Sequence, residues 1–249
     1  MGHLPDPMAL GHGNALPMKA RNIFTPELMK QARPRNLVCG ELICCPEEDA
    51  QSVFMIKRGS IKIYRNTRDG REVIVELLSK GEIFGESAVL LDSPFDCYAE
   101  ALEPTQILQV PANLFRKAIA ADPAYAWTLL GHVAQNVQRM EEELERSILL
   151  NAPQKVGCYL LRQIAGAQKR SYGHSGFCPA LLPFSKALVA FKLGMTPETM
   201  SRSIRKLVSL GLLRERGRTM VGIDPENLTQ YCCQSCSQSF PCQSAELAP

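Results

Sequence analysis

Residues 193–216 of this 249-residue chain, LGMTPETMSRSIRKLVSLGLLRER, constrain its fold more than any other stretch. Thr196 is a favourable N-cap, and Pro197 suits the first helical position, where the backbone needs no N–H partner. Gly194 suits a tight turn ahead of that cap. After the cap, apolar residues recur every three to four positions, which predicts one buried helix face. That face comprises Met200, Ile204, Leu207 and Val208. A tight turn leading into a short amphipathic helix is the layout of a helix-turn-helix.

The opposite face of this predicted helix is polar. Carboxylate, hydroxyl and guanidinium groups near a helix N-terminus suit the recognition of base edges in a DNA major groove. An ordinary amphipathic surface helix would carry a similar pattern, so this alternative stays open for the helix taken alone. The residues that we expect to contact DNA from this helix are Thr196, Glu198, Thr199, Ser201, Arg202 and Arg205.

Two short alternating segments follow the helix. Residues 212–216 and 219–223 alternate apolar and polar side chains around Gly217-Arg218, which predicts a hairpin. Such a wing would bring three guanidinium groups close to a phosphate backbone. These groups belong to Arg214, Arg216 and Arg218. A basic wing beside a polar helix favours DNA binding over an ordinary surface helix.

The distribution of charge supports double-stranded DNA as a partner. Residues 1–150 hold 16 Lys and Arg against 20 Asp and Glu, a net charge of −4. Residues 151–249 hold 12 against 5, a net charge of +7. A basic domain on an otherwise acidic chain is typical of a DNA-binding module.

The composition excludes several other classes of protein. Hydrophobic residues make up 45% and charged residues 21% of the chain, as in ordinary globular proteins. No apolar run is long enough to span a membrane, and the N-terminus lacks the features of a secretory signal, so we expect a cytoplasmic protein. Paired carboxylates, a Ser/His/Asp set and a Walker loop do not occur in a coherent context, so we do not expect an enzyme.

Short strands are predicted over residues 36–115. Four segments rich in β-branched residues are separated by turn signals, which indicates a sandwich or barrel. The segments are Val53–Ile56, Ile61–Tyr64, Val73–Leu77 and Ile107–Val110. Asp69-Gly70 between the second and third segments predicts a hairpin.

A long helix follows the strands. Apolar residues spaced 4-3-4-3-4 form a narrow heptad seam at Ala126, Leu130, Val133, Val137, Met140 and Leu144. A narrow seam on a long helix predicts pairing with a second copy, although packing on its own domain stays open. The solvent face is expected to carry Glu141, Glu142, Glu143, Glu145 and Arg146. Asn151-Ala-Pro153 ends the helix at a hinge, and residues 169–183 predict a loop.

A domain of short strands, one long helix and a winged helix, in this order, resembles the CRP/FNR family of bacterial transcription regulators. The resemblance covers roughly residues 25–232 and rests on four segments: VFMIKRGSI at 53–61, KGEIFGES at 80–87, YAEA at 98–101 and LGMTPETMSR at 193–202. It implies an α+β fold with a jelly-roll-like β-roll sensor domain, a homodimer, and RNA polymerase as a further partner. The expected units are a flexible N-terminal arm (1–22), the sensor domain (23–122), the dimerisation helix (123–151), the winged-helix DNA-binding domain (152–231) and a cysteine-rich tail (232–249).

The sequence departs from the cyclic-nucleotide-binding branch of this family. There an Arg-Ser pair follows the glutamate of the phosphate-binding cassette and holds the cyclic phosphate, whereas here the matching residues are Asp96 and Cys97. A carboxylate repels a phosphate that a guanidinium would bind, so we do not expect cAMP as a ligand. Glu86, the matching cassette glutamate, is present. Another small-molecule effector in the β-roll, with no redox role for the cysteines, stays open.

The predicted recognition helix resembles that of the oxygen-sensing FNR-like branch. Glu198, Ser201 and Arg202 match its E-x-x-S-R pattern, which implies half-sites like TTGAT in an inverted repeat. That branch carries cluster cysteines before the β-roll, but residues 1–38 contain none. We expect packing roles for Cys39, Cys44, Cys45, Cys97, Cys158 and Cys178, with Cys97 kept as a candidate redox thiol.

Four of the ten cysteines lie within eleven residues near the C-terminus: Cys232, Cys233, Cys236 and Cys242. The last three have the spacing C-x2-C-x5-C, which allows their thiolates to converge on one metal centre. Some Gram-positive members of the family that this chain resembles also carry cluster cysteines at the C-terminus. An iron–sulfur cluster is the leading hypothesis, with Cys232, a carboxylate or a partner-chain residue as its fourth ligand. A thiol switch, structural zinc and an incidental tail stay open. The sequence therefore predicts a regulator controlled by oxygen, redox state or nitric oxide.

Overall fold

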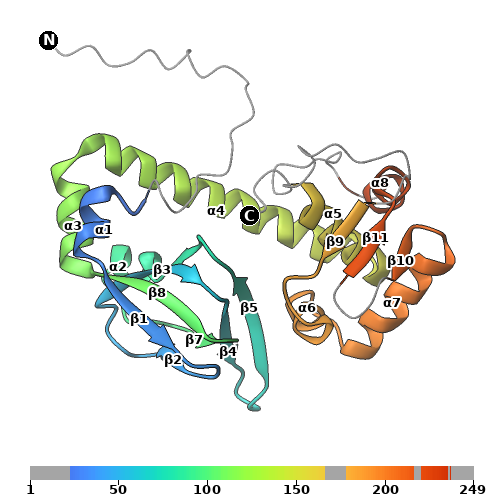
Figure 1. Ribbon diagram of the computed structural model, residues 1–249, viewed down its shortest axis with the longest axis horizontal. Coiled ribbons are helices and arrows are strands. Elements are labelled where there is room, and N and C mark those ends of the chain that lie inside the picture. The colour runs from blue at the N-terminus through green and yellow to red at the C-terminus, as the bar shows by residue number, and fades with distance from the viewer. Residues whose placement is uncertain (1–22, 166–177, 216–219, 235, 237–249) are drawn as a thin grey trace, which may run out of the picture.

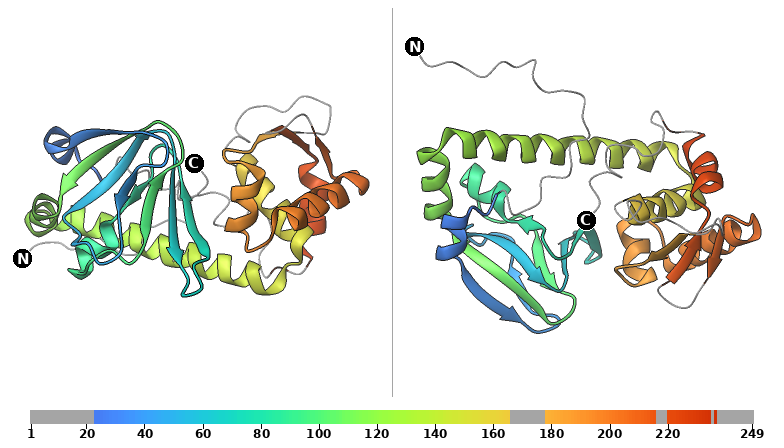
Figure 2. Two further views of the ribbon diagram at one scale, coloured as in Figure 1. Left: turned by 90° about the horizontal axis from the view of Figure 1, so that it is seen from below. Right: turned by 45° about the horizontal axis from the view of Figure 1, so that its top comes forward.

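The computed structural model describes residues 23–165, 178–215, 220–234 and 236, and shows a β domain and a smaller mixed domain placed along one long helix (Figures 1 and 2). The helices are α1 (Pro26–Gln31), α2 (Glu86–Leu91), α3 (Ala112–Ala121), α4 (Pro123–Leu149), α5 (Ala152–Ala165), α6 (Lys186–Lys192), α7 (Pro197–Ser209) and α8 (Pro225–Cys233). The strands are β1 (Arg33–Leu37), β2 (Leu42–Cys44), β3 (Ser52–Arg58), β4 (Ile61–Asn66), β5 (Glu72–Leu78), β6 (Ile83–Phe84), β7 (Tyr98–Ala101), β8 (Thr105–Pro111), β9 (Cys178–Leu181), β10 (Leu213–Glu215) and β11 (Met220–Ile223).

The N-terminal domain consists of two four-stranded antiparallel sheets, with strand orders β1-β8-β3-β6 and β2-β7-β4-β5. All four β-branched segments of the sequence form strands, and Gly70 turns between β4 and β5 with a φ of +78°. A core of aliphatic and aromatic side chains includes Phe54 and Phe84, whose rings stack with centroids 4.9 Å apart. The predicted α+β fold with an N-terminal β sensor domain is confirmed.

A second core joins the sheet to the helices. Phe115 of α3 and Tyr125 of α4 pack edge to face, and the Tyr125 hydroxyl donates to the Ile23 carbonyl at 2.7 Å. Leu129 belongs to the same core. The beginning of α4 is thereby attached to its own sensor domain, and its C-terminal end reaches the second domain (Figure 1).

The long helix ends at the predicted hinge. Leu150 has an extended backbone, and α5 begins at Ala152. In contrast to the predicted solvent face, Glu142 and Arg146 are buried and form an ion pair at 3.2 Å. The heptad pattern placed both residues away from the apolar seam, and it carries no signal for contacts with distant parts of the chain, so it did not predict their burial.

The C-terminal domain contains α5–α8 and a three-stranded sheet with the order β10-β11-β9. Its core includes Leu160, Val189, Met200 and Leu207. The predicted loop over residues 169–183 contains strand β9, which the sequence did not indicate. Pro179 lies in this strand, and a proline in a sequence argues against a strand. It is tolerated here because β9 is at the edge of the sheet.

Helices α5 and α8 approach closely at Gly157. A Cβ atom at this position would lie 2.5 Å from Cys232 Sγ and 2.9 Å from Leu228 Cδ1. Only a residue without a side chain fits there. Cys232, which the sequence analysis assigned to the terminal tail, therefore lies in α8 and in the core of the DNA-binding domain.

Within the described part of the chain, no helix is both long enough and apolar enough to cross a bilayer.

Candidate DNA interface and sensor site

Helix α7 begins as the sequence predicts. The Thr196 hydroxyl accepts a hydrogen bond from the Thr199 backbone at 3.3 Å, Pro197 is the first helical residue, and Gly194 has a φ of +66°. The polar residue Ser203 is buried on the inner face, where its hydroxyl donates to the Thr199 carbonyl at 2.8 Å. This internal bond explains how a serine can occupy a core position that the apolar pattern missed.

The apolar face of α7 is confirmed except at its end. Met200, Ile204 and Leu207 are buried, but Val208 is 38% exposed. The helical rotation of about 100° per residue carries Val208 to the edge of the buried stripe.

The outer face of α7 exposes Glu198, Ser201, Arg202 and Arg205. The polar contacts of this face are local: Arg202 Nη2 donates to the Thr199 hydroxyl at 3.2 Å. The Ser201 hydroxyl donates to the Pro197 carbonyl at 2.9 Å. The side chains that we expect to contact bases are therefore exposed to solvent on one face at the start of α7.

The charge of Glu198 is stabilised by the helix start. Its own backbone N–H, the Thr196 hydroxyl and the nearby Arg202 lower the pKa of this carboxyl below its ordinary value. The side chain is therefore an ionised hydrogen-bond acceptor at neutral pH, as contact with an amino group of a base requires.

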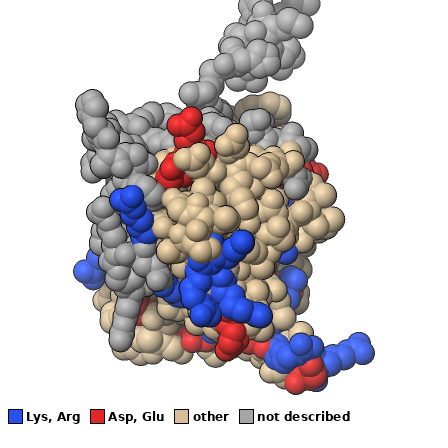
Figure 3. Space-filling view, turned by 90° about the vertical axis from the view of Figure 1, so that its right-hand side faces the viewer, with Lys and Arg blue, Asp and Glu red and all other residues tan. Residues whose placement is uncertain are grey.

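Basic side chains gather on the end of the molecule that faces away from the sensor domain (Figure 3). On α7 the exposed cationic residues are Arg202, Arg205 and Lys206. Sequence reasoning missed Lys206, although its position four residues after Arg202 places it on the same side of the helix. This outward basic face suits a polyanionic partner.

Strands β10 and β11 form the predicted wing. They pair antiparallel, with Leu213 opposite Ile223 and Arg214 opposite Gly222, and Arg214 is exposed. Arg216 and Arg218 lie outside the described residues.

The heptad seam of α4 faces solvent in the single chain. Leu130, Val137 and Met140 are exposed by 60%, 49% and 61%, and Leu144 and Val133 are also exposed. Ala126 is half-buried. Tyr125 and Leu129, which pack α4 into the core of its own sensor domain, are not part of the seam.

Two further apolar residues extend the seam. Trp127, one turn before Leu130, is 75% exposed, and Ile148, one turn after Leu144, is 71% exposed. Neither residue was predicted from the sequence, although their three- and four-residue spacing from the seam is visible there. A continuous exposed apolar stripe of this kind is characteristic of an interaction surface.

The cassette of the sensor domain lies against α4. Gly85, with a φ of +85°, links β6 to α2, and Glu86 begins that helix with a buried side chain. Glu86 Oε1 lies 3.8 Å from His132 Nε2 of α4, and Asn136 Nδ2 lies 3.1 Å from the same nitrogen. The cassette and the long helix thus meet through three polar side chains.

Asp96 occupies the position at which the cyclic-nucleotide-binding branch has an arginine. Its carboxylate pairs with the Arg65 guanidinium, whose Nε also donates to the Asp96 carbonyl at 3.3 Å. The guanidinium at this place is therefore engaged by a carboxylate of the same chain. The residues present do not fit the bidentate phosphate site of that branch.

The thiols of the sensor domain are of two kinds. Cys44 is buried as expected, but Cys39 is exposed, with its Sγ 3.2 Å from the Leu102 carbonyl, so the expectation of packing is wrong for Cys39. It lies in the turn between β1 and β2, at the surface of the domain. Burial, followed by the charge of Asp96, raises the pKa of Cys97 to about 11. A thiol that stays protonated at neutral pH is a poor redox nucleophile.

The terminal cysteines separate into buried and accessible groups. Cys232 is 1% exposed, and burial raises its pKa strongly, so it cannot bind a metal without opening the core. Cys233 and Cys236 are partly exposed, and the Cys236 N–H donates to the Cys233 carbonyl at 3.3 Å. Cys242 lies outside the described residues. Among the residues that are described, no three His, Cys, Asp or Glu side chains form a metal site.

Comparison with known proteins gives matches over both domains. Residues 34–122 match the cyclic nucleotide-binding domain family, and residues 154–231 match the Crp-like helix-turn-helix domain family. The chain is similar to a CRP-like cAMP-activated global transcriptional regulator of Mycobacterium tuberculosis, with 23% identity over 203 residues, 82% of this chain and 89% of the relative. It is also similar to electron transport regulator A of Shewanella oneidensis, with 23% identity over 198 residues, 79% of this chain and 77% of the relative.

The fold agrees with these matches. The solved structure of FixK2 from Bradyrhizobium japonicum superimposes with a TM-score of 0.68 at 24% identity, over 80% of this chain and 96% of that chain. The two domain families cover the β sensor domain and the helix-turn-helix, and the relatives span both with the long helix between them. The chain therefore belongs to the CRP/FNR family, whose members are DNA-binding transcription regulators and not enzymes.

Proposed function

We propose that this chain is a cytoplasmic homodimeric regulator that recognises a TTGAT-like inverted repeat and contacts RNA polymerase at the promoter. The observation that carries the proposal is the exposed set Glu198, Ser201 and Arg202 at the start of α7, followed on the same helix by the exposed cations Arg205 and Lys206. Arg202 is suited to bidentate bonds with a guanine, and Glu198 to accepting from a cytosine amino group. Ser201 would lie against a thymine methyl group.

The exposed stripe on α4 supports the proposed dimer. Two copies that pair in parallel along this stripe would form an isologous interface and point both α7 helices the same way. Binding to an inverted repeat requires the two half-site centres to be about one helical turn of DNA apart. The stripe supplies a symmetric surface that can fix that separation.

The DNA proposal is tested by comparing Arg202→Ala with the wing variant Arg214→Ala on operators substituted one base pair at a time. Arg202→Ala should cost about 1–3 kcal/mol and abolish the preference at one guanine. Arg214→Ala should weaken binding to all DNA sequences alike and reduce the slope of log affinity against log salt concentration by about one unit. Uniform weakening by Arg202→Ala, with every base preference intact, would show that Arg202 contacts only phosphate.

For the signal, we propose oxygen, redox state or nitric oxide acting through Cys233, Cys236 and Cys242. Two facts support this: Cys233 and Cys236 are accessible at the end of α8, and α8 packs on α5 within the DNA-binding domain. Cys232 is removed from the expected ligand set because it is a core residue. The described thiols alone do not complete an iron–sulfur site, so the choice between a cluster and a thiol switch depends on Cys242.

A triple serine variant at positions 233, 236 and 242 tests this signal without disturbing the buried Cys232. DNA binding is measured under anaerobic, reducing conditions and again after air or peroxide, with Cys39→Ser as the control for an exposed thiol elsewhere. The wild type and the control should respond to the oxidant, and the triple variant should not. An equal response in all three proteins would show that the terminal thiols are not the sensor of the oxidant. A brown absorbance that is lost in air would identify an iron–sulfur cluster.

A small-molecule effector bound by the sensor domain is the second candidate. It is favoured by the match of this domain to the cyclic nucleotide-binding family and by the buried Glu86 beside His132 and Asn136. Because Asp96 engages Arg65, the effector would not be held through a phosphate at that position. A rise in melting temperature with a metabolite, but not with cAMP, would support this candidate.

A further inference from the structure

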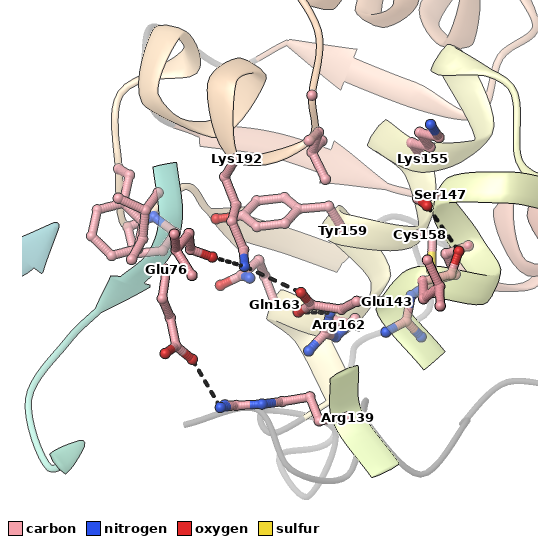
Figure 4. Close-up of a pocket in the computed structure, with 18 of the residues that line it drawn as sticks. Glu76, Arg139, Glu143, Ser147, Lys155, Cys158, Tyr159, Arg162, Gln163 and Lys192 are labelled. Atoms are coloured by element: carbon pink, nitrogen blue, oxygen red, sulfur yellow. Dashed lines mark hydrogen bonds and ion pairs between the residues drawn. The ribbon is translucent and has the colours of Figure 1, made fainter. Parts of the chain in front are cut away.

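A cavity with charged side chains in its lining lies where the sensor domain, the long helix and the DNA-binding domain meet (Figure 4). Its volume is about 900 Å³, and its walls come from β5, the C-terminal half of α4, α5 and α6. Charged side chains from all four elements line it, among them Glu76, Arg139, Glu143, Arg162 and Lys192. The DNA interface described above uses none of these residues.

Glu143 of α4 is the centre of this charged group. Its carboxylate lies 3.1 Å from Lys192 Nζ of α6 and 3.6 Å from Arg162 Nη1 of α5. Burial raises the pKa of the Glu143 carboxyl. The positive charges of Lys192 and Arg162 lower this pKa by more than burial raises it, so the pKa of Glu143 is below its ordinary value. Glu143 is therefore an anion that faces two cations of the DNA-binding domain.

Lys192 also connects to the sensor domain. Its Nζ donates to the Val75 carbonyl of β5 at 2.7 Å, in addition to its ion pair with Glu143. In a neighbouring contact, Arg139 of α4 pairs with Glu76 of β5 at 2.8 Å (Figure 4). One ammonium group thus joins α6 to both α4 and β5, and a second ion pair fixes β5 on α4.

The contact acts on the part of the domain that orients α7. Helix α6 ends at Lys192, and only residues 193–196 separate it from α7, against which it packs. The covalent link between α4 and α5 is short and extended at Leu150. Without side-chain contacts across the cavity, rotation at this link would change the direction of α7 relative to α4. Leu144 of the dimer stripe lines the same cavity, so the two interfaces are adjacent.

We propose that Glu143, Lys192 and Arg162 form an interdomain latch that sets the angle of the DNA-binding domain so that both α7 helices of a dimer reach their half-sites together. This inference rests on the proposed dimeric recognition of an inverted repeat. A fixed angle raises the effective concentration of the second reading helix after the first has bound. The angle of the DNA-binding domain does not affect binding to a single half-site, because only one α7 helix is then used. A latch residue should therefore affect binding to the repeat alone, whereas a residue that contacts DNA should affect binding to both.

The test uses Glu143→Gln, which keeps the shape of the side chain, removes its charge and lies on α4, remote from the exposed face of α7. Glu141→Gln is the matched control, since Glu141 is an exposed glutamate on the same helix. Affinity is measured for the full inverted repeat and for a duplex with one half-site. Glu143→Gln should bind the repeat about 5- to 150-fold more weakly and bind the single half-site like the wild type. The control should match the wild type on both.

A charge exchange provides an independent check on the latch. Lys192→Glu alone should weaken binding to the repeat, and adding Glu143→Lys should recover part of the loss because the pair is restored with opposite polarity. Hydrogen exchange of α6 should be faster in Glu143→Gln than in Glu141→Gln, and this measurement needs no DNA.

Three results would overturn the latch: unchanged binding of Glu143→Gln to the repeat, tighter binding to it, or an equal loss on the single half-site. If the wild type itself has no preference for the inverted repeat, the proposed DNA specificity fails. The exchange rate of α6 then still decides the latch, because equal rates in the two glutamine variants would contradict it.

Discussion

Val137→Glu tests the dimer stripe at its centre. Val137 is 49% exposed in the single chain and lies between Val133 and Met140 on α4. In a parallel dimer the two copies of this residue face each other near the symmetry axis. The substitution therefore removes apolar contact and places two carboxylates close together in a desolvated interface.

The size of the effect follows from the exposed surface. Half of a valine surface is about 75 Å², which is worth about 2 kcal/mol when buried, or about 4 kcal/mol for the two copies. A loss of about 4 kcal/mol raises the dimer dissociation constant about a thousandfold, before the repulsion between the carboxylates is added. A dimer with a nanomolar dissociation constant would then be about half dissociated at micromolar concentration and largely monomeric well below it.

Sedimentation velocity at several concentrations measures this change, and binding to the inverted repeat should fall with it. Val73→Glu is a matched control, because Val73 is also 49% exposed but lies on β5, away from the stripe. The control should remain dimeric. A Val137→Glu protein that sediments as a dimer at the same concentrations as the control would contradict this prediction and place the interface elsewhere.

The remaining predictions concern the core and the latch. Gly157→Ala should lower stability by about 1–3 kcal/mol in thermal denaturation because its Cβ would lie 2.5 Å from Cys232 Sγ, and Cys232→Ala should relieve much of the loss. No relief would mean that Cys232 is not the obstacle. Glu143, faced by Lys192, Arg162 and Arg139, has a folded pKa below its unfolded value, so its contribution is full above about pH 4.3 and is lost as pH falls through the folded pKa. The difference in melting temperature between wild type and Glu143→Gln should therefore shrink on acidification, and a constant difference would contradict the assignment.

Features with a local cause could be predicted from the sequence. The strands follow from β-branched runs between turn residues, and α7 follows from Thr196, Pro197 and the spacing of its apolar residues. The heptad spacing identified the exposed stripe of α4 because that stripe is defined by helical geometry alone. Each of these patterns depends on residues that are close together in the chain.

Features that depend on long-range contacts could not be predicted. Cysteine spacing is the same whether a thiol is accessible or buried, so only the packing of α8 on α5 shows that Cys232 is a core residue. Similarly, the sequence pattern placed Glu142 and Arg146 on a solvent face, whereas both side chains are buried in the folded chain. The contact of Lys192 with Glu143 and Val75 joins three elements that are far apart in the chain.

The arrangement of these parts indicates how a signal can reach DNA. The cassette meets α4 at His132, and the latch meets the same helix at Glu143. A change at the sensor domain that moves α4 or β5 would act directly on α6. A change at Cys233 and Cys236 would instead act within the DNA-binding domain, through α8 and α5.

The central claim is that a dimer reads an inverted repeat through α7. The most direct measurement is the affinity of the wild-type protein for duplexes carrying two TTGAT half-sites whose centres are separated by one helical turn or by one and a half turns. The account predicts tight binding at one turn, and weak binding, close to that of a single half-site, when half a turn is inserted, because the second α7 then faces the wrong side of the DNA. Equal affinity for both spacings, or for a scrambled sequence, would contradict it.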